Sequence, residues 1–383
     1  MKKMKIVMFS ECYDPTINGV VISIKTFKKD LEKLGHTVLV VAPKPKKPYI
    51  DQDKNIFRVP SIAIPGHSYY PIGVPFFSKI PQIIRKEKPD IIHVHGPFFM
   101  FSLALKTARI CRIPLVYTYH TLLAEYAHYG KILTPLVKKF LIWHSKRICN
   151  KADLVITPTN FIKELLLSYG VKTEIVPLAT GIELGQFGKA NSKKIRQELN
   201  IPLDAKVIIY VGRLAEEKNI SFLIKAVQKI FKKLPNSWLL LVGGGPQEEE
   251  YLAKIKALGM DKRTVFTGYL PKERVNEIWS SADLFLMPSE TDTQGLVVVE
   301  ALASGVPVVA IKKYGPAEII IDGECGFLVK SKDLDGFVQK AIQVLTDETL
   351  HQKLREGALK RAQDFDSKRQ AEKLIAIYQR LIK

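Results

Sequence analysis

Short runs of apolar residues alternate with longer amphipathic segments along the whole chain. This alternation is typical of strands and helices that follow one another, and it predicts parallel sheets with right-handed crossovers. In the first half of the chain, the predicted strands cover residues 5–9, 37–42, 90–94, 115–118, 154–157 and 174–176. In the second half, they cover residues 207–211, 238–242, 264–266, 284–287, 306–310 and 326–329.

The two series of strands predict an α/β fold with two Rossmann-like domains, because 383 residues are enough for two separate cores. Residues 180–192 are rich in glycine and small side chains and form the predicted boundary. We expect a first domain over residues 1–185 and a second over residues 192–366. Ligands of open parallel sheets bind beyond the carboxyl ends of the strands, so the active site is expected in the cleft between two facing sheets.

Composition limits the class of protein. No apolar run approaches the length of a membrane span, and the run over residues 6–9 is too short for the core of a signal peptide. The four cysteines are widely spaced and form no Cys-x-x-Cys pair. This spacing argues against zinc and against a disulfide framework, and it fits a reducing cytoplasm.

Positive charge is concentrated in the first half of the chain. The formal net charge is +20, and residues 1–190 hold 28 lysines and arginines against 13 acids. A basic amphipathic helix is predicted over residues 131–151, where no acid occurs and where Phe140 and Trp143 lie among the cations. Such a helix suits an anionic membrane surface. Two alternatives are a surface helix whose apolar face is core, and a nucleic-acid groove, although no nucleic-acid module is recognised.

The segment over residues 288–310 carries the most informative chemistry. Asp292 and Glu300 lie eight residues apart, and a loop that ends in Gly295 opens a helix between them. A helix N-terminus behind a glycine offers free N–H groups and a positive dipole end, which suit a phosphate. The two carboxylates lie on either side of this cradle, where each can accept hydrogen bonds from a sugar. The segment therefore predicts a site for a nucleotide-sugar.

Two cations follow another predicted strand. Arg213 and Lys218 come directly after the strand over residues 207–211. The planar fork of an arginine and the point charge of a lysine can hold a diphosphate. They can also stabilise that diphosphate as it departs, in the place of a metal ion.

At these residues the chain resembles the family 4 glycosyltransferases, which have the GT-B fold. Their signature is a glutamate, seven residues and a second glutamate, with Gly-Leu in the middle. Glu300 matches the second carboxylate, Gly295 and Leu296 match the middle, and Asp292 stands where most members have glutamate. The resemblance covers essentially the whole chain. It implies that a final helix over residues 367–383 crosses back to the first domain.

The same resemblance assigns roles to residues of other loops. Arg213 and Lys218 match the cations that hold the donor pyrophosphate. Gly19 matches the glycine loop after the first strand, where the backbone approaches the donor phosphate. His120 matches a histidine beside the anomeric carbon and the acceptor, where a polarising or hydrogen-bonding role fits a group that titrates near neutrality. Leu270 lies in a turn that corresponds to one near the nucleotide base.

Two further patterns have more than one interpretation. His93 and His95 point to the same face of a predicted strand, which suits either a metal pair or the lining of a cleft at the strand end. No third ligand is evident, so the lining is preferred. Asp51 and Asp53 form an Asp-x-Asp pattern, which we interpret as a solvated loop.

The sequence thus predicts a retaining hexosyltransferase that moves glucose from UDP-glucose to a membrane lipid such as diacylglycerol, without metal or other cofactor. The resemblance implies the retention. The residues around 117–129 and 291–295 resemble members that glycosylate diacylglycerol or related lipids. The predicted catalytic residues are His120, Arg213, Lys218 and Asp292, and the predicted donor-binding residues are Gly19, Arg213, Lys218, Leu270, Gly295, Leu296 and Glu300.

The expected partners follow from the same interpretation. They are a nucleotide-sugar, a lipid acceptor and, through the basic helix, the inner face of the cell membrane, with the protein otherwise cytoplasmic and without nucleic acid. Two alternatives remain. One is a glycosyltransferase with a soluble or polysaccharide acceptor. The other is a non-catalytic protein whose basic surface binds nucleic acid or membrane.

Overall fold

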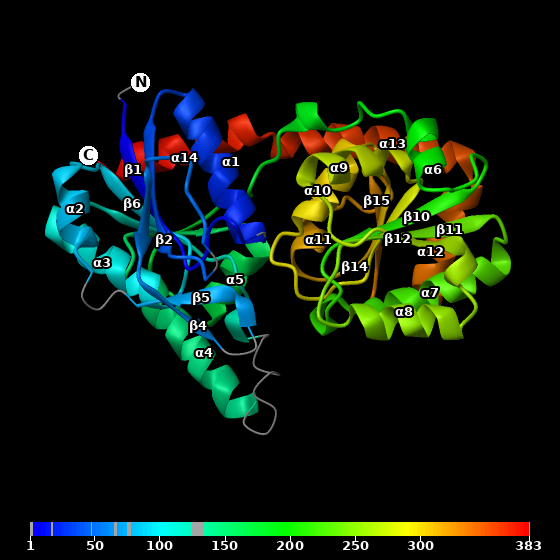
Figure 1. The fold of residues 1–383 in the computed structure, drawn as a ribbon, viewed down its shortest axis with the longest axis horizontal. Coiled ribbons are helices and arrows are strands. Elements are labelled where there is room, and N and C mark those ends of the chain that lie inside the picture. The colour runs from blue at the N-terminus through cyan, green and yellow to red at the C-terminus, as the bar shows by residue number, and fades with distance from the viewer. Residues whose placement is uncertain are drawn as a thin grey trace. The chain divides into compact units, whose positions relative to one another are not determined.

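The computed structural model describes residues 3–16, 18–46, 48–64, 67–74, 78–124 and 134–382. Internal contacts divide the chain into two units. The first consists of Met1–Gly181 with Ser367–Lys383, and the second of Ile182–Asp366. Each unit has its own parallel sheet (Figure 1). The prediction of two Rossmann-like, parallel-sheet domains is therefore confirmed. The division falls inside the glycine-rich segment over residues 180–192.

The sheet of the first unit has seven parallel strands. In spatial order they are β3 (Ile56–Val59), β2 (Thr37–Pro43), β1 (Lys5–Phe9), β6 (Ile91–Val94), β7 (Leu115–Thr118), β8 (Leu154–Thr157) and β9 (Ile175–Pro177). In the register, Val94 pairs with Phe9 on one side and with Tyr117 on the other. The carboxyl ends of β1, β6 and β7 are therefore nearly level, and the residues that follow these strands gather at one edge of the sheet.

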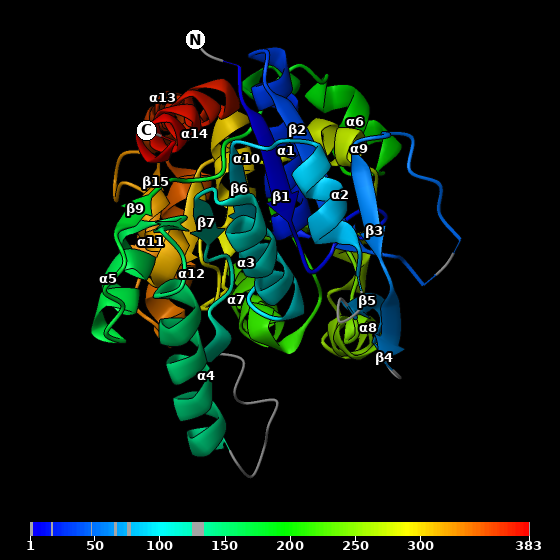
Figure 2. The same ribbon diagram turned by 90° about the vertical axis from the view of Figure 1, so that its left-hand side faces the viewer.

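Helices cover both faces of this sheet (Figure 2). On one face lie α1 (Gly19–Lys33) and α14 (Ser367–Leu381), and on the other lie α2 (Ile80–Lys86) and α3 (Phe99–Cys111). The helices α4 (Thr134–Cys149) and α5 (Asn160–Ser168) follow β7 and β8. Leu374, Ile375 and Tyr378 of α14 are buried in the core of the first unit. The final helix is therefore part of this unit.

The second unit has six parallel strands. In spatial order they are β12 (Thr264–Phe266), β11 (Ser237–Val242), β10 (Lys206–Val211), β13 (Leu284–Met287), β14 (Val308–Ile311) and β15 (Gly326–Val329). Its helices are α6 (Ser192–Glu198), α7 (Ile220–Lys233), α8 (Glu248–Ala257), α9 (Lys272–Ile278), α10 (Leu296–Ala303), α11 (Tyr314–Ile319), α12 (Leu334–Thr346) and α13 (Glu348–Ala362). The apolar face of α7 shows why these segments are helical. Leu223, Val227 and Ile230 recur at helical spacing, and all are buried.

Every predicted strand is present, with ends that differ by at most two residues. Three strands were not predicted: β3 at the edge of the first sheet, and the antiparallel pair β4 (Ser61–Ile64) and β5 (His67–Gly73). Arg58 interrupts the apolar pattern of β3, and its guanidinium pairs with Asp51 at 2.7 Å. Asp53 pairs with Lys28 at 2.8 Å. The interpretation of Asp51 and Asp53 as merely solvated is therefore wrong, because both form ion pairs within the first unit.

Candidate active site

In the second unit, the predicted donor residues gather where the strand order reverses. The sheet order turns between β10 and β13, which is the point where open α/β sheets bind ligands beyond the carboxyl ends of the strands. Arg213 and Lys218 follow β10, and Asp292 follows β13. The fold thus brings together two loops that are more than seventy residues apart in the sequence.

Lys218 and Asp292 form an ion pair at this point. The Nζ of Lys218 donates to Oδ1 of Asp292 at 2.7 Å. The other oxygen, Oδ2, is buried and has no hydrogen-bond partner. Burial raises the pKa of Asp292, but the charge and hydrogen bond of Lys218, with smaller contributions from Ser289 and Arg213, outweigh burial and lower it below its ordinary value. Asp292 is therefore an anion with one oxygen that can still accept a hydrogen bond.

Arg213 has a carboxylate partner as well. Its guanidinium forms an ion pair with Glu217, whose side chain is completely buried while that of Arg213 is 41% exposed. The ion pair orients one edge of the planar guanidinium of Arg213 and leaves a large part of this group accessible to solvent. An accessible, oriented guanidinium suits bidentate binding of a phosphate.

The helix N-terminus of the signature segment is built as predicted. Gly295 precedes α10 with a φ of +81°, in the left-handed region that favours glycine. The backbone N–H of Gly315, after β14, donates to the carbonyl of Asp292 at 3.0 Å. A Cβ on Gly315 would lie 2.3 Å from the carbonyl oxygen of Gln294, so only glycine allows this approach. The start of α11, which follows β14, therefore packs against the loop over residues 292–295.

Glu300 lies in α10 and is almost fully buried, with 3% of its surface exposed. Its carboxylate forms an ion pair with Lys272, the first residue of α9. The ammonium of Lys272 also lies 5.7 Å from the centre of the Phe187 ring. A ligand hydroxyl that binds Glu300 must share it with this lysine or displace it. The two remaining predicted residues, Leu270 and Leu296, are partly buried just before α9 and at the start of α10.

The glycine turns of this unit pack against one another. A Cβ on Gly243, after β11, would lie 2.2 Å from the carbonyl oxygen of Gly212, after β10. The N–H of Gly243 donates to Gly268, after β12, at 2.9 Å. These turns therefore hold the backbone that carries Arg213.

In the first unit, the corresponding edge of the sheet carries Gly19 and His120. Gly19 is the exposed first residue of α1, and no atom lies within 4 Å of the place where its Cβ would be. Asn18 caps this helix, because its side chain accepts a hydrogen bond from Val21 N at 2.9 Å. His120 follows β7, and burial lowers its pKa to about 4. It contacts His95, which follows β6, at 2.9 Å between ring nitrogens.

Glu11 is a titratable group at this edge that the sequence analysis did not single out. It follows β1, and its Oε1 accepts hydrogen bonds from the N–H groups of Phe98 at 2.9 Å and Met100 at 3.0 Å. These bonds satisfy donors at the start of α3. Burial nevertheless raises the pKa of Glu11 to about 7. A carboxyl group that is partly protonated near neutrality thus lies one strand away from His95.

The basic helix α4 exposes apolar side chains. Leu136, Phe140 and Trp143 are 65%, 58% and 51% exposed. The Phe140 and Trp143 rings lie 5.8 Å apart, and the guanidinium of Arg147 lies 5.2 Å from the Trp143 ring. The alternative in which the apolar face of this helix is core is therefore wrong at these three positions, although it holds for Ile148 and Cys149. Lys131 and residues 125–133 lie outside the described part of the chain.

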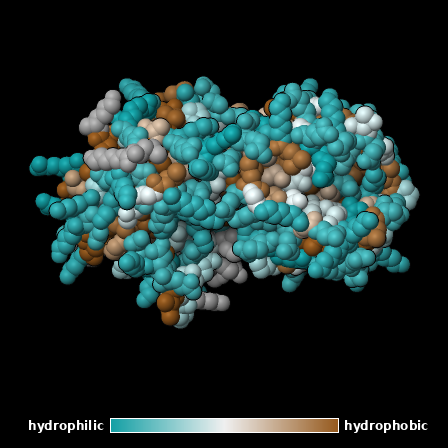
Figure 3. All heavy atoms as spheres, turned by 90° about the horizontal axis from the view of Figure 1, so that it is seen from above, coloured by the Kyte–Doolittle hydropathy of each residue, from teal (hydrophilic) through white to brown (hydrophobic). Residues whose placement is uncertain are grey.

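The turn before α3 adds another exposed aromatic ring next to α4. Phe98 is 48% exposed, and its ring stacks on His144 of α4 at 5.7 Å. His144 also contacts the carbonyl of Pro97 at 2.8 Å. We call Phe98, Leu136, Phe140 and Trp143, with the exposed cations Lys138, Lys139, Lys146 and Arg147, the aromatic–basic surface. In both views of the ribbon, α4 extends away from the sheet (Figures 1 and 2). By contrast, hydrophobic atoms appear only in scattered groups on the face drawn in Figure 3.

Comparison with known proteins identifies the family. The model described as Glycosyltransferase Family 4 matches residues 17–186, and the one described as Glycosyl transferases group 1 matches residues 191–361. An alpha-monoglucosyldiacylglycerol synthase of Streptococcus pneumoniae is 32% identical over 92% of this chain and 82% of its own length. The chain belongs to glycosyltransferase family 4. A synthase of the same name from Acholeplasma laidlawii is 33% identical over 86% of each chain.

Other similar proteins carry different names. A GDP-mannose-dependent alpha-mannosyltransferase of Corynebacterium glutamicum is 29% identical over 92% of this chain and 83% of its own length. Among solved structures, the Anabaena protein HepE in complex with UDP superposes with a TM-score of 0.81 at 20% identity, over 99% of this chain and 100% of its own. Sucrose-phosphate synthase from Thermosynechococcus elongatus gives 0.80 at 23% identity, over 99% of each chain. These likenesses show the GT-B fold.

In this family 4 enzyme, the sequence analysis missed three residues that hold the predicted site together. They are Glu217, Lys272 and Gly315. Glu217 is only four residues from Arg213, so this pair is local in the sequence, although the segment between them is a loop and not an α-helix. Lys272 and Gly315 reach the site only through the fold, because their partners are 28 and 21 or more residues away.

Two other features of the family 4 enzyme lie apart from this chemistry. Among the described residues, no group of three or more histidines, cysteines or acids is placed to hold a metal ion, and no helix is long and apolar enough to cross a membrane.

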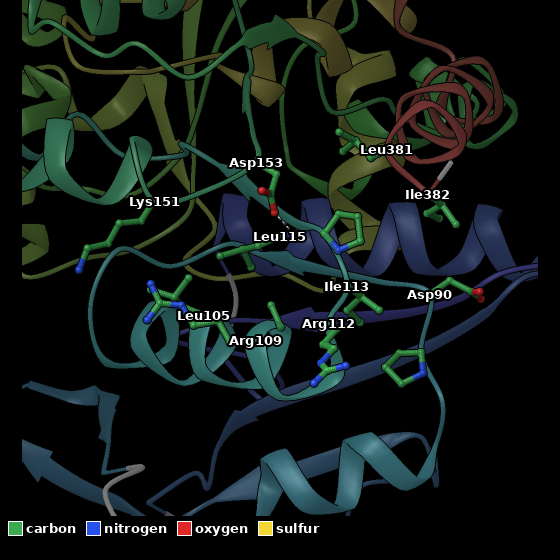
Figure 4. A pocket seen from close by; sticks show the side chains of 13 residues that line it. Asp90, Leu105, Arg109, Arg112, Ile113, Leu115, Lys151, Asp153, Leu381 and Ile382 are labelled. Atoms are coloured by element: carbon green, nitrogen blue, oxygen red, sulfur yellow. Dashed lines mark hydrogen bonds between the residues drawn. The ribbon is translucent and has the colours of Figure 1, made fainter.

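A cavity of about 830 Å³ in the first unit is lined by Asp90, Arg109, Arg112, Lys151 and Asp153 among others (Figure 4). These residues precede β6, β7 and β8, so the cavity lies at the opposite edge of the sheet from His95 and His120.

Proposed function

We propose that the protein transfers glucose from UDP-glucose to diacylglycerol or a related membrane lipid, with retention of configuration at the anomeric carbon. The observation that carries the transferase proposal is the Lys218–Asp292 pair at the turn of the second sheet, beside Arg213 and the start of α10. The lipid and glucose parts are supported by the names of the two synthases that this chain resembles. Retention and metal independence rest on family membership.

Arginine, lysine and backbone N–H groups of the proposed donor site bind the diphosphate. Arg213 and Lys218 bind the diphosphate, and they stabilise the additional negative charge that develops on the β-phosphate as the bond between the anomeric carbon and the phosphate oxygen breaks. The N–H groups at the start of α10 bind the same phosphates. With these donors in place, no divalent metal is needed for the leaving group.

The two carboxylates recognise hydroxyl groups. Oδ2 of Asp292 is buried and unpartnered, so it can accept a hydrogen bond from the transferred sugar. Glu300 binds the ribose hydroxyls and exchanges its contact with Lys272 for them. In the first unit, His120 donates a hydrogen bond to the sugar, and the open backbone at Gly19 allows a phosphate to approach.

The aromatic–basic surface brings the enzyme to its lipid acceptor. Four cations attract anionic headgroups, and each contributes about 1 kcal/mol near such a surface. The exposed rings of Phe98, Phe140 and Trp143 enter the interface between headgroups and acyl chains. We place the enzyme on the inner face of the cell membrane, where both UDP-sugars and anionic lipids are available.

One comparison favours a second donor. The chain also resembles proteins named as GDP-mannose-dependent mannosyltransferases, so mannose from GDP-mannose is the competing donor. A soluble or polysaccharide acceptor is the competing acceptor. A non-catalytic protein with a basic surface is the competing class.

The test combines a donor panel with defined vesicles. The protein is incubated with UDP-glucose, UDP-galactose or GDP-mannose and with phosphatidylcholine vesicles that contain diacylglycerol, with and without phosphatidylglycerol. Mass spectrometry identifies the product, and the proton coupling at the anomeric carbon gives its configuration. We expect α-glucosyldiacylglycerol from UDP-glucose alone, more of it with the anionic lipid, and the same rate in EDTA.

The other outcomes separate the alternatives. A mannosylated lipid would overturn the donor, and a β-linked product would overturn retention. Saturable UDP-glucose binding with slow hydrolysis but no lipid product would favour a soluble or polysaccharide acceptor. Salt-sensitive DNA binding without any UDP-glucose binding would favour the non-catalytic protein.

A further inference from the structure

Three histidines form a row at the carboxyl edge of the first sheet. His93 lies in β6, His95 directly follows it, and His120 follows the neighbouring strand β7. The rings of His93 and His95 are 4.1 Å apart, and those of His95 and His120 are stacked at 5.2 Å with 23° between their planes. Nδ1 of His95 lies 2.9 Å from Nε2 of His120. One of these two nitrogens must donate a proton and the other must accept it.

From this arrangement we propose that His95 is a positioning residue that fixes the tautomer of His120, with the proton of His120 on Nδ1 and with Nε2 as acceptor. The proposal rests on the proposed function only for the role of His120 at the sugar. The proton arrangement itself follows from the contacts of His95.

The unpartnered nitrogen of His95 decides which ring donates. Its Nε2 is buried and has no hydrogen-bond partner. If His120 donated its Nε2–H, His95 would accept at Nδ1 and carry its own proton on Nε2, as a buried N–H without an acceptor. If His95 donates from Nδ1, only a lone pair remains unpartnered. Buried N–H groups without an acceptor are rarer than acceptors without a donor, so the second arrangement is favoured.

The neighbouring groups hold His95 in this arrangement. The backbone N–H of His95 donates to the carbonyl of Phe9 at 2.7 Å, which extends the pairing of β6 with β1. His93 cannot take over the role of partner, because its own ring nitrogens contact Tyr378 and Thr118, each at 2.6 Å. With 3% of its surface exposed, His95 has little room to change rotamer.

Both rings are neutral at physiological pH. Burial lowers the pKa of His120 to about 4, and burial together with the other two histidines lowers that of His95 well below its ordinary value. Each ring therefore carries one proton, and the hydrogen bond between them determines where the proton of His120 lies. A neutral imidazole with a fixed Nδ1–H presents a hydrogen-bond donor of defined direction and no charge.

Two variants of His95 separate positioning from packing. His95→Asn keeps an amide N–H near the place of Nδ1, whereas His95→Leu fills the space without a donor. The protein is labelled with nitrogen-15 at histidine, and two-bond couplings of the ring nitrogens report the tautomer of His120. His120→Gln identifies the signals of His120. UDP binding is measured on each variant, because the donor residues of the second unit are unchanged.

We expect Nδ1–H at His120 in the parent protein and in His95→Asn, and loss of that single tautomer in His95→Leu. In the transfer assay, kcat should fall roughly tenfold in His95→Leu, be largely restored in His95→Asn, and leave UDP affinity unchanged. An Nε2–H tautomer at His120 in the parent, or an unchanged tautomer in His95→Leu, overturns the proposal. Equal kcat in both variants overturns the positioning role. Because the tautomer is measured without substrate, a failure to find transfer would count against the proposed function alone.

Discussion

At the scale of single residues, the cations of the donor site are held by carboxylates before any donor binds. Arg213 pairs with Glu217, and Lys218 pairs with Asp292. Replacing Arg213 or Lys218 by alanine should lower kcat by about 100-fold or more, because the charge that they stabilise grows as the diphosphate leaves. Steady-state kinetics with saturating vesicles measures this effect.

The matched control is Lys225→Ala, at an exposed lysine of α7 in the same unit. It should retain the parent kcat. If Arg213→Ala and Lys218→Ala changed only the KM for the lipid, these cations would not act on the leaving group.

In the proposed function, Asp292 has two contacts to lose, the observed one to Lys218 and the proposed one to the sugar. Asp292→Ala should lower activity strongly, because it frees Lys218 and removes the acceptor at Oδ2. Asp292→Glu restores the carboxylate that is usual in the family and should keep partial to full activity. The double variant Asp292→Ala with Lys218→Ala should lose less than the product of the two single losses, since the two residues act as a pair. Strictly multiplicative losses would show that they act independently.

Glu300 and Lys272 form a second ion pair, which a donor bound as proposed would disturb. Glu300→Gln should weaken UDP binding by about 1.5–3 kcal/mol, the usual worth of a hydrogen bond to a charged group. Calorimetric titration with UDP tests this expectation. Lys272→Met is the control, because it breaks the same ion pair without removing the carboxylate. If both variants weakened UDP equally, the pair rather than Glu300 itself would support the nucleotide.

At the scale of elements, the sequence predicted the positions of the strands better than it predicted which faces of a helix are exposed. The central strands of both sheets are buried on both faces, so their apolar runs are short and continuous and easy to find. The edge strand β3 was missed because Arg58 sits in it with a structural partner, Asp51. The exposure of α4 could not be read from its pattern, because apolar residues at helical spacing look alike whether they face a core or a membrane.

The aromatic–basic surface predicts how the enzyme binds vesicles. Changing Lys138, Lys139, Lys146 and Arg147 to glutamate should abolish flotation with vesicles that contain phosphatidylglycerol, because the attraction to the anionic headgroups becomes repulsion. For the parent, flotation should fall with salt, since the screening length is about 10 Å at 0.1 M. A part of the binding should remain at high salt, because the exposed rings of Phe140 and Trp143 enter the membrane interface. The double variant Phe140→Ser with Trp143→Ser should remove that part.

The charge control is the reversal of four exposed lysines of the second unit, Lys225, Lys232, Lys233 and Lys256. This variant has the same net charge as the α4 variant and should still float. Activity on a short, water-soluble acceptor should survive in both. Normal flotation of the α4 variant would remove the main physical support for a lipid acceptor.

At the scale of the whole molecule, the sequence predicted that the donor residues gather in the second unit, because these residues follow its strands. It could not find the partners that hold those residues, such as Gly315, whose contact depends on the packing of the start of α11 against the loop after β13. Nor could it show that α14 supports the histidine row. Tyr378 of this last helix contacts His93 at 2.6 Å, across 285 residues of sequence.

That row, together with His36 of the same unit, makes the stability of the first unit depend on pH. Burial lowers the pKa of four described histidines, to about 3 for His93 and about 4 for His120, and lowers those of His36 and His95 as well. In the unfolded chain, these groups take up protons as the pH falls below about 6.5, whereas in the folded unit they stay neutral. Stability is therefore full above pH 6.5 and falls toward pH 4, by at most about 1.4 kcal/mol per pH unit for each histidine.

Glu11 acts in the opposite direction. Its pKa is raised from 4.5 to about 7 in the folded unit. As the pH falls from 7 to 4.5, the folded unit therefore takes up the proton of Glu11 before the unfolded chain does. This difference increases the stability of the folded unit over that range. Between pH 7 and 5, Glu11→Gln should therefore make the loss of stability in acid steeper, and His95→Asn should make it shallower. A carboxylate of the same unit with a lowered pKa, such as Asp53, loses its contribution only at lower pH. Hydrogen exchange of β6 and β7 in urea at pH 5, 6 and 7 measures the free energy of unfolding of this unit. The assigned charge states would be contradicted if the free energy of unfolding of the parent protein were constant between pH 5 and 7. They would also be contradicted if this free energy fell less steeply with decreasing pH in Glu11→Gln than in the parent.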